Sequence, residues 1–128
     1  MQTLKLTGII ADQPSANGYI YPTDVLAKAI AGAQHSINNR SFLGTIGSDE
    51  VTIMNTTHLV TELKLENNHV ISTIEILPTE YGEHLSEMLT RYTPQSNIYS
   101  VVKIEGNLVT EMQISQINVV LKPSGRFV

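Results

Sequence analysis

The stretch NIYSVVKIEGNLVTEMQISQINVVL (residues 97–121) contains two apolar-rich segments separated by Gly106 and Asn107. Each segment alternates apolar and polar side chains over part of its length, which is typical of a half-buried β-strand. Glycine and asparagine both tolerate the left-handed backbone that a tight turn requires. The stretch therefore predicts an antiparallel hairpin, with strands at residues 97–105 and 108–121.

Further strands are predicted upstream of this hairpin. Residues 3–10 alternate well enough for a first strand, and this alternation does not resemble a signal peptide. Residues 51–65 predict a long strand that carries Ile53, Thr57, Leu59, Leu63 and Leu65 on one side. A turn at 66–68 leads to a returning strand at 69–77. Residues 93–97 predict a loop.

Two segments change to helical spacing. Residues 23–37 predict an amphipathic helix with Thr23 as its proposed N-cap. Its apolar face is predicted to consist of Val25, Ala29, Ile30, Ala33 and Ile37. A shorter helix is predicted after Thr79, its proposed N-cap. The order is strand, helix, two strands, helix, two strands. It predicts an α+β fold in which a small, mostly antiparallel β-barrel or curved sheet is flanked by two helices, as a single domain over residues 1–128.

Composition excludes several classes of function. The 128 residues carry 8 Lys and Arg against 12 Asp and Glu, a net charge of −4, so no nucleic-acid partner is expected. No apolar run approaches the roughly 20 residues that span a bilayer, so no membrane association is expected. The chain has no cysteine, which excludes thiolate metal sites and cysteine nucleophiles. No histidine pair has the spacing of a helical metal site, so neither a metal nor a cofactor is expected.

Four stretches, in one order, resemble motifs of the prohead core proteases of tailed bacteriophages, which are relatives of the herpesvirus assemblins. NGYIYPTDVLAKAI (17–30) is similar to that family's N-x-R-x-Y-P turn and helix, and LGTIGSDE (43–50) to its G-E-L-x-H-P loop. HVISTIEILPTEYGEHLSEML (69–89) resembles the strand, T-P-x-G turn and helix that follow. NIYSVVKIEG through INVVLKPS (97–124) resembles the S-S-R-G-x-G strand and the closing D-x-V-x-x-P-S.

The resemblance implies a serine protease fold, but its two key positions are changed. The family's general base, a loop histidine, falls on Ser48, and its nucleophile, the first serine of the pair, falls on Tyr99. A serine hydroxyl does not accept a proton at neutral pH, and a phenol does not replace a serine alkoxide in acyl transfer. The family's arginine and glycines beyond the serines fall on Val101, Val102 and Ile104. The resemblance thus implies the fold without the reaction.

An active protease stays open as an alternative, with Ser100 as nucleophile, His58 as base, and Asp49 or Glu50 as the orienting carboxylate. Strand alternation argues against it, because it places Ser100 on an apolar face, where a small buried hydroxyl is expected. The same alternation places His58 on a mixed polar face as a half-exposed histidine.

The function expected from these patterns is that of a phage capsid protein, of the decoration or assembly kind, on an inactive prohead-protease fold. Its expected partner is the major capsid protein or another head protein, with homo-oligomers also possible, and its expected location is the virion after assembly in the host cytoplasm. The C-terminal residues Arg126, Phe127 and Val128 are the candidate partner-binding strip. A small β-barrel binding module unrelated to phages is the remaining alternative.

Overall fold

The computed structural model describes residues 2–47, 50–52 and 54–123. The described residues form the five strands and two helices predicted, in the predicted order, and a sixth, short strand lies in the loop after the first helix. The elements are β1 (Thr3–Ile10), α1 (Thr23–Asn38), β2 (Leu43–Gly44), β3 (His58–Glu66), β4 (His69–Ile76), α2 (Glu80–Met88), β5 (Tyr92–Glu105) and β6 (Leu108–Pro123).

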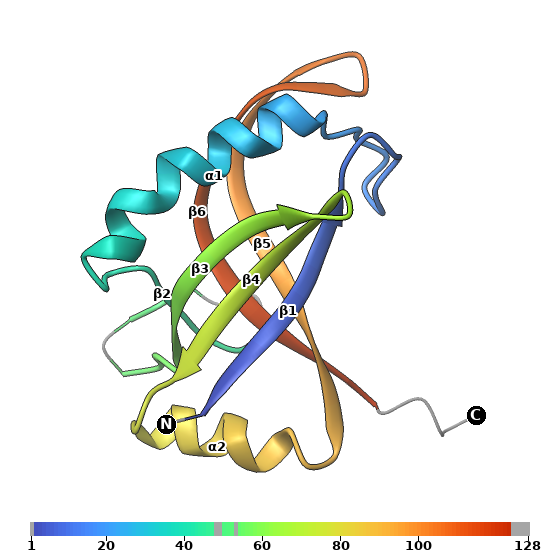
Figure 1. Cartoon of the computed structure of the whole chain (residues 1–128). Helices are drawn as coiled ribbons and strands as arrows, with labels where there is room; N and C mark the ends of the chain where they lie inside the picture. Colours follow the sequence, from blue (N-terminus) through green and yellow to red (C-terminus); the bar gives the residue numbers. More distant parts are fainter. Residues whose placement is uncertain (1, 48–49, 53, 124–128) are drawn as a thin grey trace.

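The strands form two sheets that together make a half-barrel. The sheets are connected along one side, through the loop at residues 43–47, and no backbone pairing closes the other side among the described residues. One sheet has the order β1-β4-β3-β2, and the long hairpin of β5 and β6 forms a second sheet that crosses behind it (Figure 1). All pairs of named strands are antiparallel. The predicted α+β class and curved antiparallel sheet are confirmed, although the barrel closes on one side only.

Strand alternation builds the core on the concave side of this sheet. In β4, four alternate residues are buried between half-buried neighbours, as expected for a strand with one face in the core. Helix α1 packs along β6 and β3, and α2 lies across the end of the half-barrel where β4 ends and β5 begins (Figure 1). The buried face of α1 consists of Leu26, Ala29, Ile30, Ala33 and Ile37. Four of these were predicted, whereas the predicted Val25 is only partly buried.

Both helix starts involve side-chain oxygens. Thr79 is the N-cap of α2, as predicted, and its hydroxyl accepts a hydrogen bond from the Gly82 N–H at 2.9 Å. Thr23 was predicted to cap α1 but is instead its first residue. The carboxylate of Asp12 accepts the Thr23 N–H at 3.1 Å and the Thr23 hydroxyl at 2.6 Å. A residue eleven positions earlier in the chain therefore anchors the N-terminus of α1.

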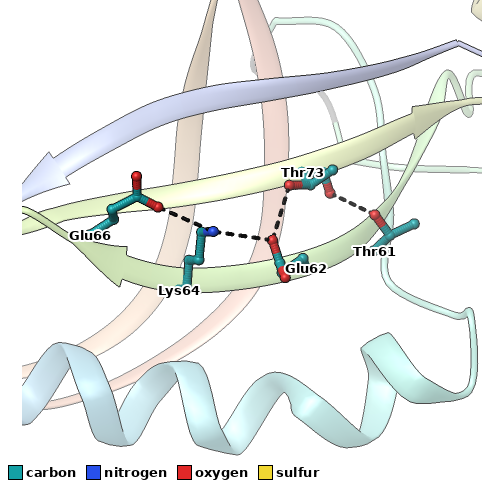
Figure 2. Close-up of polar contacts among 5 residues, drawn as sticks. All are labelled: Thr61, Glu62, Lys64, Glu66 and Thr73. Carbon is teal, nitrogen blue, oxygen red and sulfur yellow. Dashed lines mark hydrogen bonds and ion pairs between the residues drawn. The ribbon is translucent and has the colours of Figure 1, made fainter.

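A β-bulge in β3 overturns the predicted faces of that strand. The register with β4 shifts between Val60 and Glu62, so Thr61 is an extra residue, and an extra residue reverses the alternation on either side of it. His58 and Val60 consequently share the core face with Leu63. Figure 2 shows the other face, where Lys64 lies between Glu62 and Glu66; the ammonium is 3.1 Å from the Glu66 carboxylate.

Two further predicted boundaries were wrong. Residues 51, 52 and 54–57 are not part of β3, because a polar turn occupies part of this stretch: Thr52 N–H donates to Asn55 Oδ1 at 2.7 Å, and Asn55 Nδ2 donates to the Glu50 carbonyl at 3.0 Å. Ile53, which was predicted to lie in this strand, is outside the described residues. Residues 93–97 are strand rather than loop, since β6 is long enough to pair with them. Among the described residues, no helix is both long and apolar enough to cross a membrane.

Candidate functional site

The stretch that resembles a catalytic loop joins the two sheets of the half-barrel. Leu43 in β2 pairs with Leu59 in β3, which ties the stretch to the first sheet. Farther along the stretch, the Gly47 N–H donates to the Val119 carbonyl at 2.8 Å, and the Val119 N–H donates to the Thr45 carbonyl at 3.0 Å. Residues 43–47 therefore fix the position of β6 relative to β3.

A buried asparagine holds this loop in place. Asn118 is fully buried, its Oδ1 accepts the Thr45 N–H at 3.1 Å, and its Nδ2 donates to the Gly47 carbonyl at 3.0 Å. Gln116 extends the connection, because its Nε2 donates to Asn118 Oδ1 at 2.7 Å and its Oε1 accepts the Val51 N–H at 3.3 Å. Two amide side chains of β6 thus add to the backbone hydrogen bonds that the loop makes with Val119. Neither residue was identified from the sequence.

His58 lies beneath this loop and is fully buried, so the prediction of a half-exposed histidine was wrong. The physical reason is the bulge at Thr61, which places His58 on the core face. Gly44 makes room for the imidazole: a Cβ at this position would lie 2.3 Å from His58 Nε2 and 2.2 Å from the Ile117 carbonyl oxygen. The side chain is therefore enclosed between β2, β3 and β6.

Both ring nitrogens of His58 are engaged. Nε2 is 2.9 Å from the Ile117 carbonyl oxygen, and a carbonyl only accepts, so Nε2 carries the proton. Nδ1 then accepts the hydroxyl proton of Thr57, which lies 2.7 Å away. Burial lowers the pKa of His58, and the hydrogen bond to Ile117 opposes that effect. The neutral imidazole has no free lone pair with which to act as a general base.

Tyr99 and Ser100 lie on opposite faces of β5. Tyr99 pairs with Gln116 of β6, and its hydroxyl accepts a hydrogen bond from Asn97 Nδ2 at 2.8 Å. Ser100 pairs with Ile114, because Ser115 is an extra residue in β6 at this point. Ser100 thus points to the apolar side, as predicted, although it is half-buried rather than enclosed.

The predicted catalytic residues are not assembled in the described part of the chain. No hydrogen bond joins Ser100 to His58 there, and the nitrogens of His58 are directed to Ile117 and Thr57. Ser48 and Asp49 lie outside the described residues, as do Arg126, Phe127 and Val128. Glu50 is described and exposed, and its backbone carbonyl accepts from Asn55.

The described residues contain no group of three or more His, Asp or Glu side chains that could hold a metal ion. His35 lies in α1, where its Nε2 is 3.1 Å from Asn39 Nδ2. His69, at the start of β4, has Nδ1 2.8 Å from the Asn67 carbonyl. His84 lies in α2, so the four histidines belong to separate surroundings.

Comparison with known proteins gives a likeness in fold. No protein-family model and no curated protein matches the sequence. Among solved structures, the chain is similar to the bacteriophage T4 capsid assembly protease, gp21, with a TM-score of 0.78 over 92% of this chain and 80% of that chain. The two sequences are 13% identical. The chain therefore has a prohead-protease-like α+β fold.

Proposed function

We propose that this chain is a bacteriophage head protein that binds the major capsid protein and does not cleave it. The observation that carries the proposal is the burial of His58 within a prohead-protease-like fold. A general base must reach the proton that it abstracts. This imidazole is instead enclosed, with its nitrogens committed to Ile117 and Thr57.

The position of Tyr99 supports the same proposal. By the resemblance, Tyr99 stands where the family has its nucleophilic serine. Its hydroxyl accepts from Asn97, and its cross-strand neighbour Gln116 is bonded to the loop. A phenol in this place is a packing and hydrogen-bonding group, with no base beside it in the described residues to activate it.

Binding without cleavage is a small change for such a fold. A capsid assembly protease must already recognise head proteins, and loss of the base and nucleophile leaves the recognising surface intact. The proposed location is the virion. A specific contact with the capsid is expected to bury roughly 1,000 Å² or more. The strip formed by Arg126, Phe127 and Val128 stays a predicted part of that contact.

A sedimentation experiment tests this proposal. The purified full-length chain is mixed with empty capsid shells of the phage that encodes it and separated on a density gradient. We expect saturable co-sedimentation at a fixed ratio to the major capsid protein, with that protein uncleaved. Absence of binding would overturn the proposal. So would cleavage of a capsid or scaffold protein that is abolished by Ser100→Ala, since this would establish the alternative protease.

A further inference from the structure

The outer part of the β5–β6 hairpin projects from the body of the protein. Helix α1 packs on β6, and the hairpin continues beyond α1 to its turn (Figure 1). β1 meets the outer edge of β5 farther down the strand, where the Ser96 hydroxyl donates to the Thr7 carbonyl at 3.2 Å. Residues 101–105 lie beyond that contact, and all of them except the half-buried Val102 are exposed. This part of β5 is therefore a sheet edge that faces solvent.

The backbone groups on this edge follow from the bonds that β6 makes. The Val109 N–H donates to the Ile20 carbonyl at 2.9 Å, away from β5. Residues opposite each other in an antiparallel pair turn their backbone groups either toward each other or both away, so Ile104, the partner of Val109, turns its groups outward. Both bulges of the hairpin are extra residues of β6, so alternation along β5 is unbroken and Val102 also turns outward. Such unpaired groups are a template for another strand.

Apolar and charged side chains gather on the same segment. Three large apolar side chains are exposed there: Val101 (69%), Ile104 (38%) and Leu108 (42%). The Lys103 ammonium lies 2.9 Å from the Glu111 carboxylate across the hairpin, and its three N–H donors leave room for a second carboxylate. Glu105 is exposed and has no ion pair within the described residues. The edge thus carries both a cation and an unpaired anion, two positions apart.

We propose that this edge binds a second copy of the chain, by antiparallel pairing of the two β5 strands about a two-fold axis at Ile104. The two Ile104 residues then lie opposite each other and exchange backbone hydrogen bonds. Each Lys103 lies opposite the Glu105 of the second copy, and a two-fold interface forms this ion pair twice. The inference goes beyond the proposed function and does not depend on it.

The charges and the packing of β1 select this register. A two-fold axis at either charged residue would place like charges opposite each other, which destabilises a strand pair. An axis at Val102 would bring the turn of the second copy opposite Ile98, where β1 already packs: a Cβ on Gly8 would lie 3.1 Å from the Ile98 side chain. The axis at Ile104 places that turn beside Val102, short of this contact.

Charge-reversal variants test the pairing of Lys103 with Glu105. Lys103→Glu alone would place two glutamates opposite each other at both ion pairs, and Glu105→Lys alone would place two lysines there. An equimolar mixture of the two variants restores opposite charges in a heterodimer. Lys122→Glu and Glu83→Lys are matched controls, because they make the same changes in net charge at exposed positions at the far end of β6 and in α2.

Sedimentation velocity of the purified full-length chain, between roughly 5 and 500 µM, measures the self-association. A contact of this size is weak, and we expect a dissociation constant of order 100 µM. Each single charge reversal should raise that constant at least about tenfold, and the mixture should return it to within about threefold of wild type. The two control variants should stay within about twofold.

Substitutions at Ile104 test the backbone contact. Ile104→Pro removes an outward N–H and leaves the pairing with β6 intact, while Ile104→Thr retains the N–H. Both variants lose the apolar side chain, so the dimer should be weaker in the proline variant than in the threonine variant. Thermal unfolding of every variant identifies any that has lost its fold.

A wild-type chain that stays monomeric at about 500 µM overturns the proposal. A dimer that is unchanged in both single charge reversals also overturns it, as does a mixture that associates no better than each variant alone. These outcomes are separable from that of the capsid proposal. Shell binding by a chain that stays monomeric would retain the head-protein role and remove the dimer, and a dimer that does not bind shells would do the reverse.

Discussion

His58 of β3 donates its Nε2–H to the carbonyl oxygen of Ile117 of β6 over 2.9 Å, and this bond connects the two sheets of the half-barrel. The imidazole is fully buried below Gly44 and receives the Thr57 hydroxyl at its other nitrogen. A residue with catalytic chemistry therefore serves as a structural cross-link.

The first prediction concerns pH. Burial lowers the pKa of His58, so as pH falls the unfolded chain takes up this proton before the folded chain does. The neutral imidazole thus contributes its full stability above about pH 6.5, the ordinary histidine pKa, and this contribution is lost as pH falls from there toward the lower folded pKa. The limiting slope for one group is about 1.4 kcal/mol per pH unit.

Urea unfolding of wild type and His58→Asn between about pH 7.5 and pH 5 measures this slope. We expect the variant to be less stable at neutral pH and to lose less stability on acidification. His84→Gln, which removes an exposed imidazole from α2, controls for the loss of a histidine. An unchanged slope in His58→Asn would contradict the assigned role.

The second prediction compares two glycine substitutions that should change the free energy of unfolding in opposite directions. Gly44→Ala places a methyl group 2.2 Å from the Ile117 carbonyl oxygen, a backbone atom that cannot move aside, and is expected to cost about 3 kcal/mol of unfolding free energy. Gly32→Ala, in α1, meets no atom within 4 Å and should stabilise by up to about 1 kcal/mol, the helix propensity difference. Thermal unfolding distinguishes them, and equal effects would refute the packing described for Gly44.

The third prediction concerns the loop anchor. Asn118→Ala leaves the Thr45 N–H and the Gly47 carbonyl without their partner and should cost about 1–3 kcal/mol. Asn97→Ala, on β5, removes a single bond to a half-buried hydroxyl and should cost less. Hydrogen exchange at the Thr45 amide gives a local readout, because it should accelerate in Asn118→Ala and not in Asn97→Ala. Equal protection in both variants would show that the amide does not hold the loop.

The fourth prediction concerns residual serine reactivity. Without a base near Ser100 in the described residues, its hydroxyl should not react with a fluorophosphonate probe, which labels activated serines. Intact mass measurement after incubation should therefore show the unmodified chain. Stoichiometric labelling that disappears in both Ser100→Ala and His58→Ala would establish the catalytic alternative instead.

Much of the fold follows from local sequence patterns. Alternation predicts β4 and the long hairpin, helical spacing predicts the buried face of α1, and Gly106 marks the hairpin turn. The face of β3 was not predictable, because the bulge at Thr61 has no local signal and depends on pairing with β4. The extension of β5 over 93–97 likewise depends on its partner strand. Partial closure of the barrel is a tertiary property that no single segment encodes.

The candidate site was predicted less well. The resemblance pointed to the loop at 43–50 and to Tyr99, and the structure fixes residues 43–47 beside the strand that pairs with Tyr99. The anchor Asn118 was missed, although a lone amide within the apolar run INVVL is a signal for a buried hydrogen bond. The enclosure of His58 depends on Gly44, which is close in space and fourteen positions away in the chain.

The central claim is that the chain is a non-proteolytic head protein of a phage. Quantitative mass spectrometry of purified mature particles tests it most directly, by counting copies of the chain relative to the major capsid protein. The account predicts the intact chain at a fixed, high ratio in every preparation. Its absence from mature particles, or its recovery only as traces of cleaved fragments, would contradict the account and indicate a factor that acts during assembly and is then lost.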